Sequence, residues 1–255
     1  MKRTMDNNFH YKFIKPEESL ADFVESFGMF YTSSDEPKEV VVMPDGRIDL
    51  FFLKPANAPF HVTLTGLETA PKQRNIPPQT CFFDINFKPL AVEYILHTSI
   101  ADAVNKAKNL ADDFWNFNED DLNDFDSFYA KASQTIKAIL PVTIDERKRK
   151  LFDLIYTSNG EMSVKELAEN VFWSSRQINR YFNRQFGLSL KAYCNILRFR
   201  ASLEHIAQGK LFPELNFTDQ THFIKQIKKF SGVVPKELSK NKNDRFVLLS
   251  VLKQQ

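Results

Sequence analysis

The stretch SVKELAENVFWSSRQINRYFNRQFG, residues 163–187, decides the fold of the second half of this 255-residue chain. Ser163 and Ser174 are each followed three residues later by Glu or Gln, which is the spacing of a capping box at a helix start. Apolar residues recur at helical spacing after each cap, and Gly187 supplies the left-handed residue that ends a helix. The segment therefore predicts two short helices joined by a tight turn.

The second of these predicted helices has two contrasting faces. Ile178, Tyr181, Phe182 and Phe186 recur at helical spacing and form the inward face. The opposite face carries guanidinium and amide side chains and no acidic residue, and such groups hydrogen-bond base edges and phosphates. This face consists of Arg176, Gln177, Asn179, Arg180, Asn183 and Arg184. The pattern is typical of a helix-turn-helix with its DNA recognition helix, although solvated surface helices can also be basic and amphipathic.

A second segment, DQTHFIKQIKKFSG (residues 219–232), repeats the pattern at an offset of 45 residues. At that offset the caps Ser174 and Asp219 coincide, and so do the two terminal glycines. Between the copies, residues 189–208 predict a linking helix that begins at a serine cap and ends just before a glycine. Repeats of this kind indicate repeated structural units, so the sequence predicts a second helix-turn-helix.

Charge is distributed unevenly along the chain, although the whole protein has a formal net charge of only +2. Residues 147–255 contain 20 Lys and Arg against 9 Asp and Glu, a balance of +11. Residues 1–146 contain 14 against 23, a balance of −9. A basic helical half is expected to bind the phosphates of DNA, and an acidic half is expected to stay away from them.

Residues 147–238 resemble the DNA-binding domain of AraC/XylS-type transcription regulators. Three stretches carry the resemblance: ELAENVFWSSRQINRYFNRQFGLSLKAY, RFRAS, and NFTDQTHFIKQIKKFSGVVPKEL. The resemblance implies two helix-turn-helix units per chain, with their recognition helices in successive segments of the major groove. By position, it implies base-edge contacts from Arg176, Asn179 and Arg180 in the first unit. In the second unit Thr221, Ile224 and Lys225 stand at the equivalent positions, with Gln220 adjacent to them.

The second unit departs from the family pattern in two ways. The stretch before it, GKLFPELNF (residues 209–217), contains Pro213, which forbids more than about one turn of supporting helix. Ile224 is an apolar side chain where a polar base contact is expected, and its best partner is a thymine methyl group. We therefore expect weaker base discrimination from this unit, with phosphate contacts from its basic residues Lys225, Lys228 and Lys229.

The N-terminal half predicts a β-rich domain with a helical pair. Residues 40–53 place two apolar runs around Pro-Asp-Gly and predict a β-hairpin, and residues 60–67 and 80–88 predict further strands. Residues 98–111 and 121–140 predict helices. PDGRIDLFF and FKPLA resemble the partly barrel-like sensing domains of some regulators in the same family. The predicted fold is α+β, with a β-rich domain at 1–142 and an all-α domain at 143–255, joined by a hinge at Leu140 to Thr143.

Other classes of site have little support in the sequence. Cys81 and Cys194 lie in different halves, so no disulfide framework is expected, and no apolar stretch approaches the length of a membrane span. The acidic segment 112–126 lacks the ligand order of a calcium loop, and the five histidines show no metal-ligand spacing. No nucleophile motif or phosphate-binding glycine loop is present. We expect a cytoplasmic protein that is not an enzyme and has no metal or cofactor.

The sequence as a whole predicts a transcription regulator whose basic half binds double-stranded DNA. The expected further partners are a small-molecule effector, a second copy of the chain through the N-terminal half, and RNA polymerase. The 25 phenylalanines fit core packing, with a ligand cavity as the alternative. Two other functions stay open: a protein-interaction module whose basic half binds an acidic partner, and an enzyme regulated by DNA. The sequence does not distinguish activation from repression.

Overall fold

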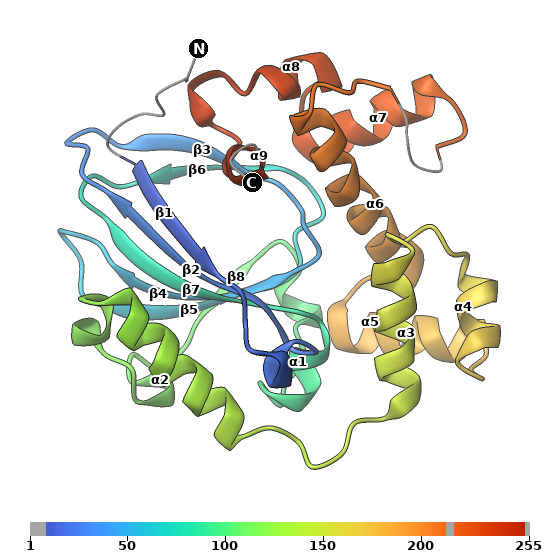
Figure 1. Cartoon of the computed structure of the whole chain (residues 1–255), viewed down its shortest axis with the longest axis horizontal. Helices are drawn as coiled ribbons and strands as arrows, with labels where there is room; N and C mark the ends of the chain where they lie inside the picture. Colours follow the sequence, from blue (N-terminus) through green and yellow to red (C-terminus); the bar gives the residue numbers. More distant parts are fainter. Residues whose placement is uncertain (1–8, 213–216, 253–255) are drawn as a thin grey trace.

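The computed structural model describes residues 9–212 and 217–252. It has the expected α+β architecture, with a β-rich N-terminal half and a helical C-terminal half (Figure 1). Pro213, which the sequence predicts to shorten the second supporting helix, lies outside the described residues. In the described ranges, no helix has the length and apolar character needed to cross a membrane.

The N-terminal half is built on a six-stranded antiparallel sheet. In spatial order its strands are β1 (Phe9–Ile14), β2 (Val24–Thr32), β7 (Cys81–Phe87), β4 (Ile48–Lys54), β5 (His61–Thr65) and β8 (Ala107–Asn109). A separate two-stranded sheet pairs β3 (Lys38–Val42) with β6 (Lys72–Ile76). Three short helices lie between strands: η1 (Glu18–Leu20), α1 (Leu90–Tyr94) and η2 (Ala101–Ala103). Two more, η3 (Phe114–Asn116) and η4 (Glu119–Leu122), lie between β8 and the next helix.

Helix α2 (Phe125–Ala138) covers one face of the large sheet (Figure 1). The side chain of Asp124 caps it by accepting a hydrogen bond from the backbone N of Ser127. Its apolar face is buried on aromatic side chains of the strands, with the Phe128 ring 5.2 Å from Phe52 and 5.1 Å from Phe83. The helix confirms the prediction for 121–140 in its core but begins four residues later, because η4 precedes it.

The predicted hairpin at 40–53 is wrong. A turn does form, with the Asp45 carboxylate accepting the backbone N–H of Arg47 at 2.9 Å and Gly46 at φ +77°. However, β3 pairs only with β6, while β4 pairs with β5 and β7. The reason is packing: Val41 and Met43 belong to an apolar cluster built mainly by the C-terminal helices, so β3 turns away from β4.

The predicted helix at 98–111 is also wrong. This segment contains only η2 and then β8, which extends the large sheet by pairing with β5. Asn105 has φ +57°, a left-handed conformation that interrupts a helix, and the backbone N of Leu110 donates to the carbonyl of Val62. Cross-strand hydrogen bonds therefore replace the local helical bonds that the sequence pattern favours.

The C-terminal half is helical throughout its described part. Its elements are α3 (Glu146–Thr157), α4 (Val164–Asn170), α5 (Ser175–Phe186), α6 (Leu190–Ala207), α7 (Gln220–Ser231), α8 (Pro235–Lys240), η5 (Lys242–Asp244) and α9 (Val247–Leu252). The long helix α6 is the predicted linking helix, and it lies between α5 and α7 (Figure 1).

The two halves share their apolar cores. One continuous cluster contains Phe27 and Phe87 from the sheet together with Phe152 and Phe182 from α3 and α5. A second apolar cluster contains residues of the four helices α6, α7, α8 and α9 together with Val41 of β3 and Met43 just after it. At that contact the backbone N of Val41 donates to the carbonyl of Arg245 at 2.7 Å. The helices are therefore packed on the β-rich half along both clusters.

Candidate nucleic-acid interface

The two helices α4 and α5 and their caps form as the local sequence predicts. The backbone N of Ser163 donates to the Glu166 carboxylate at 2.8 Å, and the backbone N of Glu166 donates to the Ser163 hydroxyl at 3.2 Å. Ser174 and Gln177 form the same reciprocal pair at 2.8 and 3.2 Å. Gly187 has φ +74° and its backbone N donates to the Asn183 carbonyl, closing α5. Both capping boxes and the glycine end are confirmed.

The inward face of α5 anchors the helix in the shared core. Ile178, Phe182 and Phe186 are fully buried. The Phe182 ring lies 5.7 Å from Phe152 of α3 and 5.6 Å from Tyr193 of α6. Because these contacts come from the helices on either side, they fix which face of α5 points to solvent.

The outward face of α5 presents three guanidinium groups. Arg176, Arg180 and Arg184 are exposed, and within the described part of the chain none of them forms an ion pair. The amide groups of the face are already engaged. Asn179 is half-buried; its Nδ2 donates to the Ser175 carbonyl at 3.0 Å, and its Oδ1 accepts the backbone N of Leu190 at 3.3 Å.

The other two amides of this face are also used locally. Gln177 Oε1 completes the capping box, and Asn183 Nδ2 donates to the Asn179 carbonyl at 2.8 Å. Both side chains stay exposed, so each keeps part of its hydrogen-bonding capacity. The arginines are thus the groups of α5 with the most unused donors, five N–H groups each.

The C-terminal end of α5 is held by the N-terminal half, which the sequence did not predict. The Ser99 hydroxyl donates to the Arg184 carbonyl at 2.8 Å, and the backbone N of Ile100 donates to the Gln185 carbonyl at 3.0 Å. Gln185 Nε2 donates back to the Thr98 carbonyl at 2.5 Å. The last carbonyls of a helix have no partner within it, so these bonds stabilise the end of α5 from outside.

Gly187 allows this close approach of the two halves. A Cβ at this position would lie 2.5 Å from the carbonyl oxygen of Ala101. Glycine is needed here both for its positive φ and for the absence of a side chain. We refer to the contact of residues 98–101 with the end of α5 as the helix-end contact.

The basic cluster Arg147 to Lys150 is largely neutralised within the chain. Arg147 pairs with Asp145 at 2.8 Å, and Arg149 pairs with Asp22 at 3.0 Å. Lys148 Nζ lies 2.5 Å from the Glu93 carboxylate, which also accepts the Tyr181 hydroxyl at 3.2 Å. Burial and the nearby Glu93 charge raise the pKa of Tyr181, so its hydroxyl remains a donor. This cluster therefore joins the two halves, and little of its charge is free for phosphates.

The second unit presents a lysine face on α7. The Asp219 carboxylate caps the helix by accepting the backbone N of His222 at 2.7 Å, and Gly232 ends it at φ +81°. Ile224 is half-buried and packs against the second apolar cluster. The exposed side chains are Gln220, Thr221, Lys225, Lys228 and Lys229.

A buried ion cluster lies where the two halves meet. Arg47 is 5% exposed; its Nη2 lies 3.0 Å from a Glu25 oxygen, and its guanidinium lies 4.9 Å from the centre of the Tyr156 ring. Lys15 and Arg200 also approach Glu25, at 3.0 and 3.5 Å. Burial raises the pKa of Glu25, but the three surrounding cations outweigh burial and hold that pKa well below its usual range.

A buried carboxyl, Asp84, and a half-buried one, Asp49, occupy the other face of the large sheet. Asp84 lies fully inside, and no hydrogen-bond partner is found for its Oδ1 among the described residues. Burial raises the pKa of Asp84 well above its usual range, and the nearby Asp49 raises it further. Burial, with the Asp45 charge, also raises the pKa of Asp49 to about 7.

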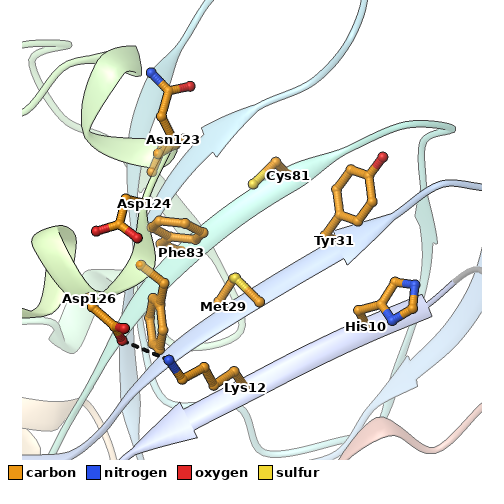
Figure 2. A pocket seen from close by; sticks show the side chains of 11 residues that line it. His10, Lys12, Met29, Tyr31, Cys81, Phe83, Asn123, Asp124 and Asp126 are labelled. Carbon is orange, nitrogen blue, oxygen red and sulfur yellow. Dashed lines mark hydrogen bonds and ion pairs between the residues drawn. The ribbon is translucent and has the colours of Figure 1, made fainter.

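A shallow hollow of about 410 Å³ lies beside the start of α2. Figure 2 shows His10, Tyr31, Met29 and Cys81 along its floor, and the ion pair between Lys12 and Asp126 at one end. Burial raises the pKa of the Cys81 thiol, which keeps it protonated near neutral pH. In residues 9–212 and 217–252, no three His, Cys, Asp or Glu side chains are grouped so as to hold a metal ion.

Comparisons with known proteins give a partial match. Residues 12–108 match a family model described as a domain of unknown function, DUF6597. A comparison with curated proteins finds no match. A solved structure of ToxT from Vibrio cholerae is 12% identical over 92% of this chain and 98% of that chain, with a TM-score of 0.44. Unsaturated fatty acid bound wild-type ToxT from strain SCE256 is 10% identical over 93% and 96%, also with a TM-score of 0.44. Because these TM-scores lie below 0.5, we infer function from this chain's own residues.

Proposed function

We propose that this chain is a sequence-specific DNA-binding transcription regulator of the AraC type, with α5 as its principal recognition helix. The observation that carries the proposal is the set of three exposed guanidinium groups on the acid-free face of a helix capped at both ends. Burial of the opposite face and the helix-end contact fix the direction in which these groups point. A rigidly placed arginine can donate two parallel hydrogen bonds to guanine in the major groove.

The structure refines which side chains of α5 we assign to base contacts. Arg176 and Arg180 lie about one helical turn apart on the exposed face, and we assign base-edge contacts to them. Asn179 is assigned a positioning function, since its Oδ1 accepts the first backbone N–H of α6. Arg184 and the lysines of α7 are assigned to phosphates, where charge counts more than orientation.

Regulation is proposed to act through the N-terminal half. We place the boundary between the halves at residues 142–143, where Val142 is fully exposed in the connection from α2 to α3. Binding of a small-molecule effector, or pairing of two copies through this half, would displace residues 98–101 and so change the support of α5. RNA polymerase is the expected partner at the promoter.

The proposal is tested by titrating labelled duplex DNA with the intact chain and following fluorescence anisotropy at increasing salt. The intact chain is used because the two halves share one apolar cluster. If about six phosphates are neutralised, the slope of log K against log salt should be about −5. A slope near zero would contradict the proposal. If polyglutamate competes as well as DNA does, the basic half is instead a docking site for an acidic partner.

A further inference from the structure

Phe172, in the turn between α4 and α5, has an unusual conformation for an aromatic residue. Its φ is +54°, and its side chain is 86% exposed. The residues on either side are anchored. Val171 is buried, and the Trp173 ring packs 5.7 Å from Tyr181 and lies under the Arg147 guanidinium at 5.3 Å. The turn is therefore held in place by its neighbours, and Phe172 points outward.

Neither feature of Phe172 benefits the isolated chain. A left-handed backbone is disfavoured for bulky residues because Cβ approaches a carbonyl oxygen, whereas glycine adopts it freely. An exposed ring contributes no apolar burial to the fold. A strained backbone that is held in place next to a binding surface is characteristic of functional positions.

We propose that Phe172 contacts duplex DNA through the apolar groups at the edge of the major groove, namely thymine methyls and deoxyribose carbons. This inference rests on the proposed function of α5. Phe172 lies two residues before the cap Ser174, and the exposed side chains that follow it, ending at Arg176, are polar or basic. A side chain placed there lies beside the N-terminal turn of the recognition helix, the part of such a helix that contacts base edges.

The surroundings of Phe172 favour DNA over a protein partner. Across the described helices α3 to α6, it is the only large apolar side chain that is exposed. A stable protein interface needs about 800 Å² on each partner and an apolar centre, which a single ring among polar groups does not provide. The nearest acidic side chain in sequence, Glu169 on α4, lies 3.9 Å from the Lys165 ammonium, so its charge is partly compensated.

The test compares Phe172→Gly with the parent chain on a DNA site selected by the parent. Glycine removes the ring and relieves the backbone, so the variant should melt about 2–4 °C higher. Its Kd for the selected site should rise on the order of fivefold or more, while the salt slope stays unchanged because no phosphate contact is lost. Phe172→Asn, whose residue type tolerates a left-handed backbone, should show the same loss of affinity.

Gln79→Gly is the matched control, because Gln79 is also exposed and has φ +47° but lies in the β6–β7 connection. It should leave DNA binding unchanged. If Phe172→Gly binds the selected site as tightly as the parent, the proposed contact is wrong. If Phe172→Gly keeps its DNA affinity but loses binding to RNA polymerase, the proposed DNA contact is also wrong. If the parent itself binds no duplex DNA, the proposed function fails before Phe172 is tested.

Discussion

Replacing Arg47 with methionine should strongly destabilise the contact between the two halves. Methionine keeps most of the apolar stem but removes the charge that faces Glu25 at 3.0 Å. It also removes the guanidinium that lies over the Tyr156 ring and the hydrogen bond from Arg47 Nη1 to the Gly46 carbonyl. The contacts with Glu25 and Tyr156 join the turn after β3 to β2 and α3, so their loss weakens the base on which α3 rests.

Breaking a buried ion pair from one side costs about 3–5 kcal/mol, because the remaining charge stays buried without compensation. Glu25 keeps Lys15 and Arg200 nearby, which reduces the expected loss to about 2–4 kcal/mol. The pKa of Glu25 lies well below its usual range, so the carboxylate is charged at about pH 5 and above. Its contribution to the free energy of unfolding is lost only as pH falls below the unfolded-state pKa of about 4. The loss should therefore be similar at pH 5 and pH 8.

Urea unfolding of the parent and Arg47→Met, followed by tryptophan fluorescence, measures this loss. Lys137→Met is the control, since its ion pair with Glu17 is solvent-exposed and should contribute less than about 1 kcal/mol. If Arg47→Met costs no more than the control, the buried ion cluster does not hold the two halves together.

Three further predictions test other parts of the account. Asp84→Asn should raise the free energy of unfolding by about 1–2 kcal/mol at about pH 8 and little at about pH 4. A carboxyl with a raised folded-state pKa destabilises the protein as pH rises from about 4 through that pKa, which is about 7 for the neighbouring Asp49. Urea titrations at both pH values check this. Ser99→Ala should cost about 1 kcal/mol and speed amide exchange in the last turn of α5, and unchanged exchange would show that the helix-end contact is weak. Arg180→Ala should cost about 1–3 kcal/mol at a specific site, whereas Lys228→Ala should weaken all sequences alike, as anisotropy with specific and random duplexes would show.

The parts of the fold that the sequence predicted well are those fixed by neighbouring residues. The caps at Ser163 and Ser174, the glycine ends of α5 and α7 and the inward face of α5 depend on spacings of three to four residues, which are visible in sequence. Strands β5 and β7 were expected for the same reason, since alternation is local.

The errors arose where distant residues decide the structure. The turn at Gly46 was expected to return the chain as a hairpin, but the Tyr193 hydroxyl from α6 donates to its carbonyl at 3.1 Å and Leu197 fills the space beside it. The residue pattern of 98–111 favours a helix, yet residues 107–109 pair with the edge of β5 and form β8. Strands β1, β2 and β6 were not predicted, since β6 is a polar edge and β1 and β2 lack a clear turn between them.

The candidate site shows the same division. The six polar residues on the face of α5 were predicted from the sequence, but apart from the capping-box pair of Gln177 with Ser174 their hydrogen-bond partners were not. Asn179 supports α6, and Ser99 holds the end of α5. Arg147 and Arg149 are held in ion pairs. These interactions depend on contacts between segments far apart in the chain or on side-chain geometry, which the sequence pattern does not show. Net charge alone therefore overestimates the charge that α3 offers to DNA.

Selection of binding sites from a random duplex pool by the intact chain tests the central claim most directly. The account predicts one well-defined sequence block, which is lost or relaxed when Arg180→Ala is used in the same selection. About ten base pairs away, one helical turn of DNA, a weaker or A·T-biased block should reflect the lysine face of α7. A selection that enriches no sequence, or a block that Arg180→Ala selects unchanged, would contradict the assignment of α5 as the recognition helix.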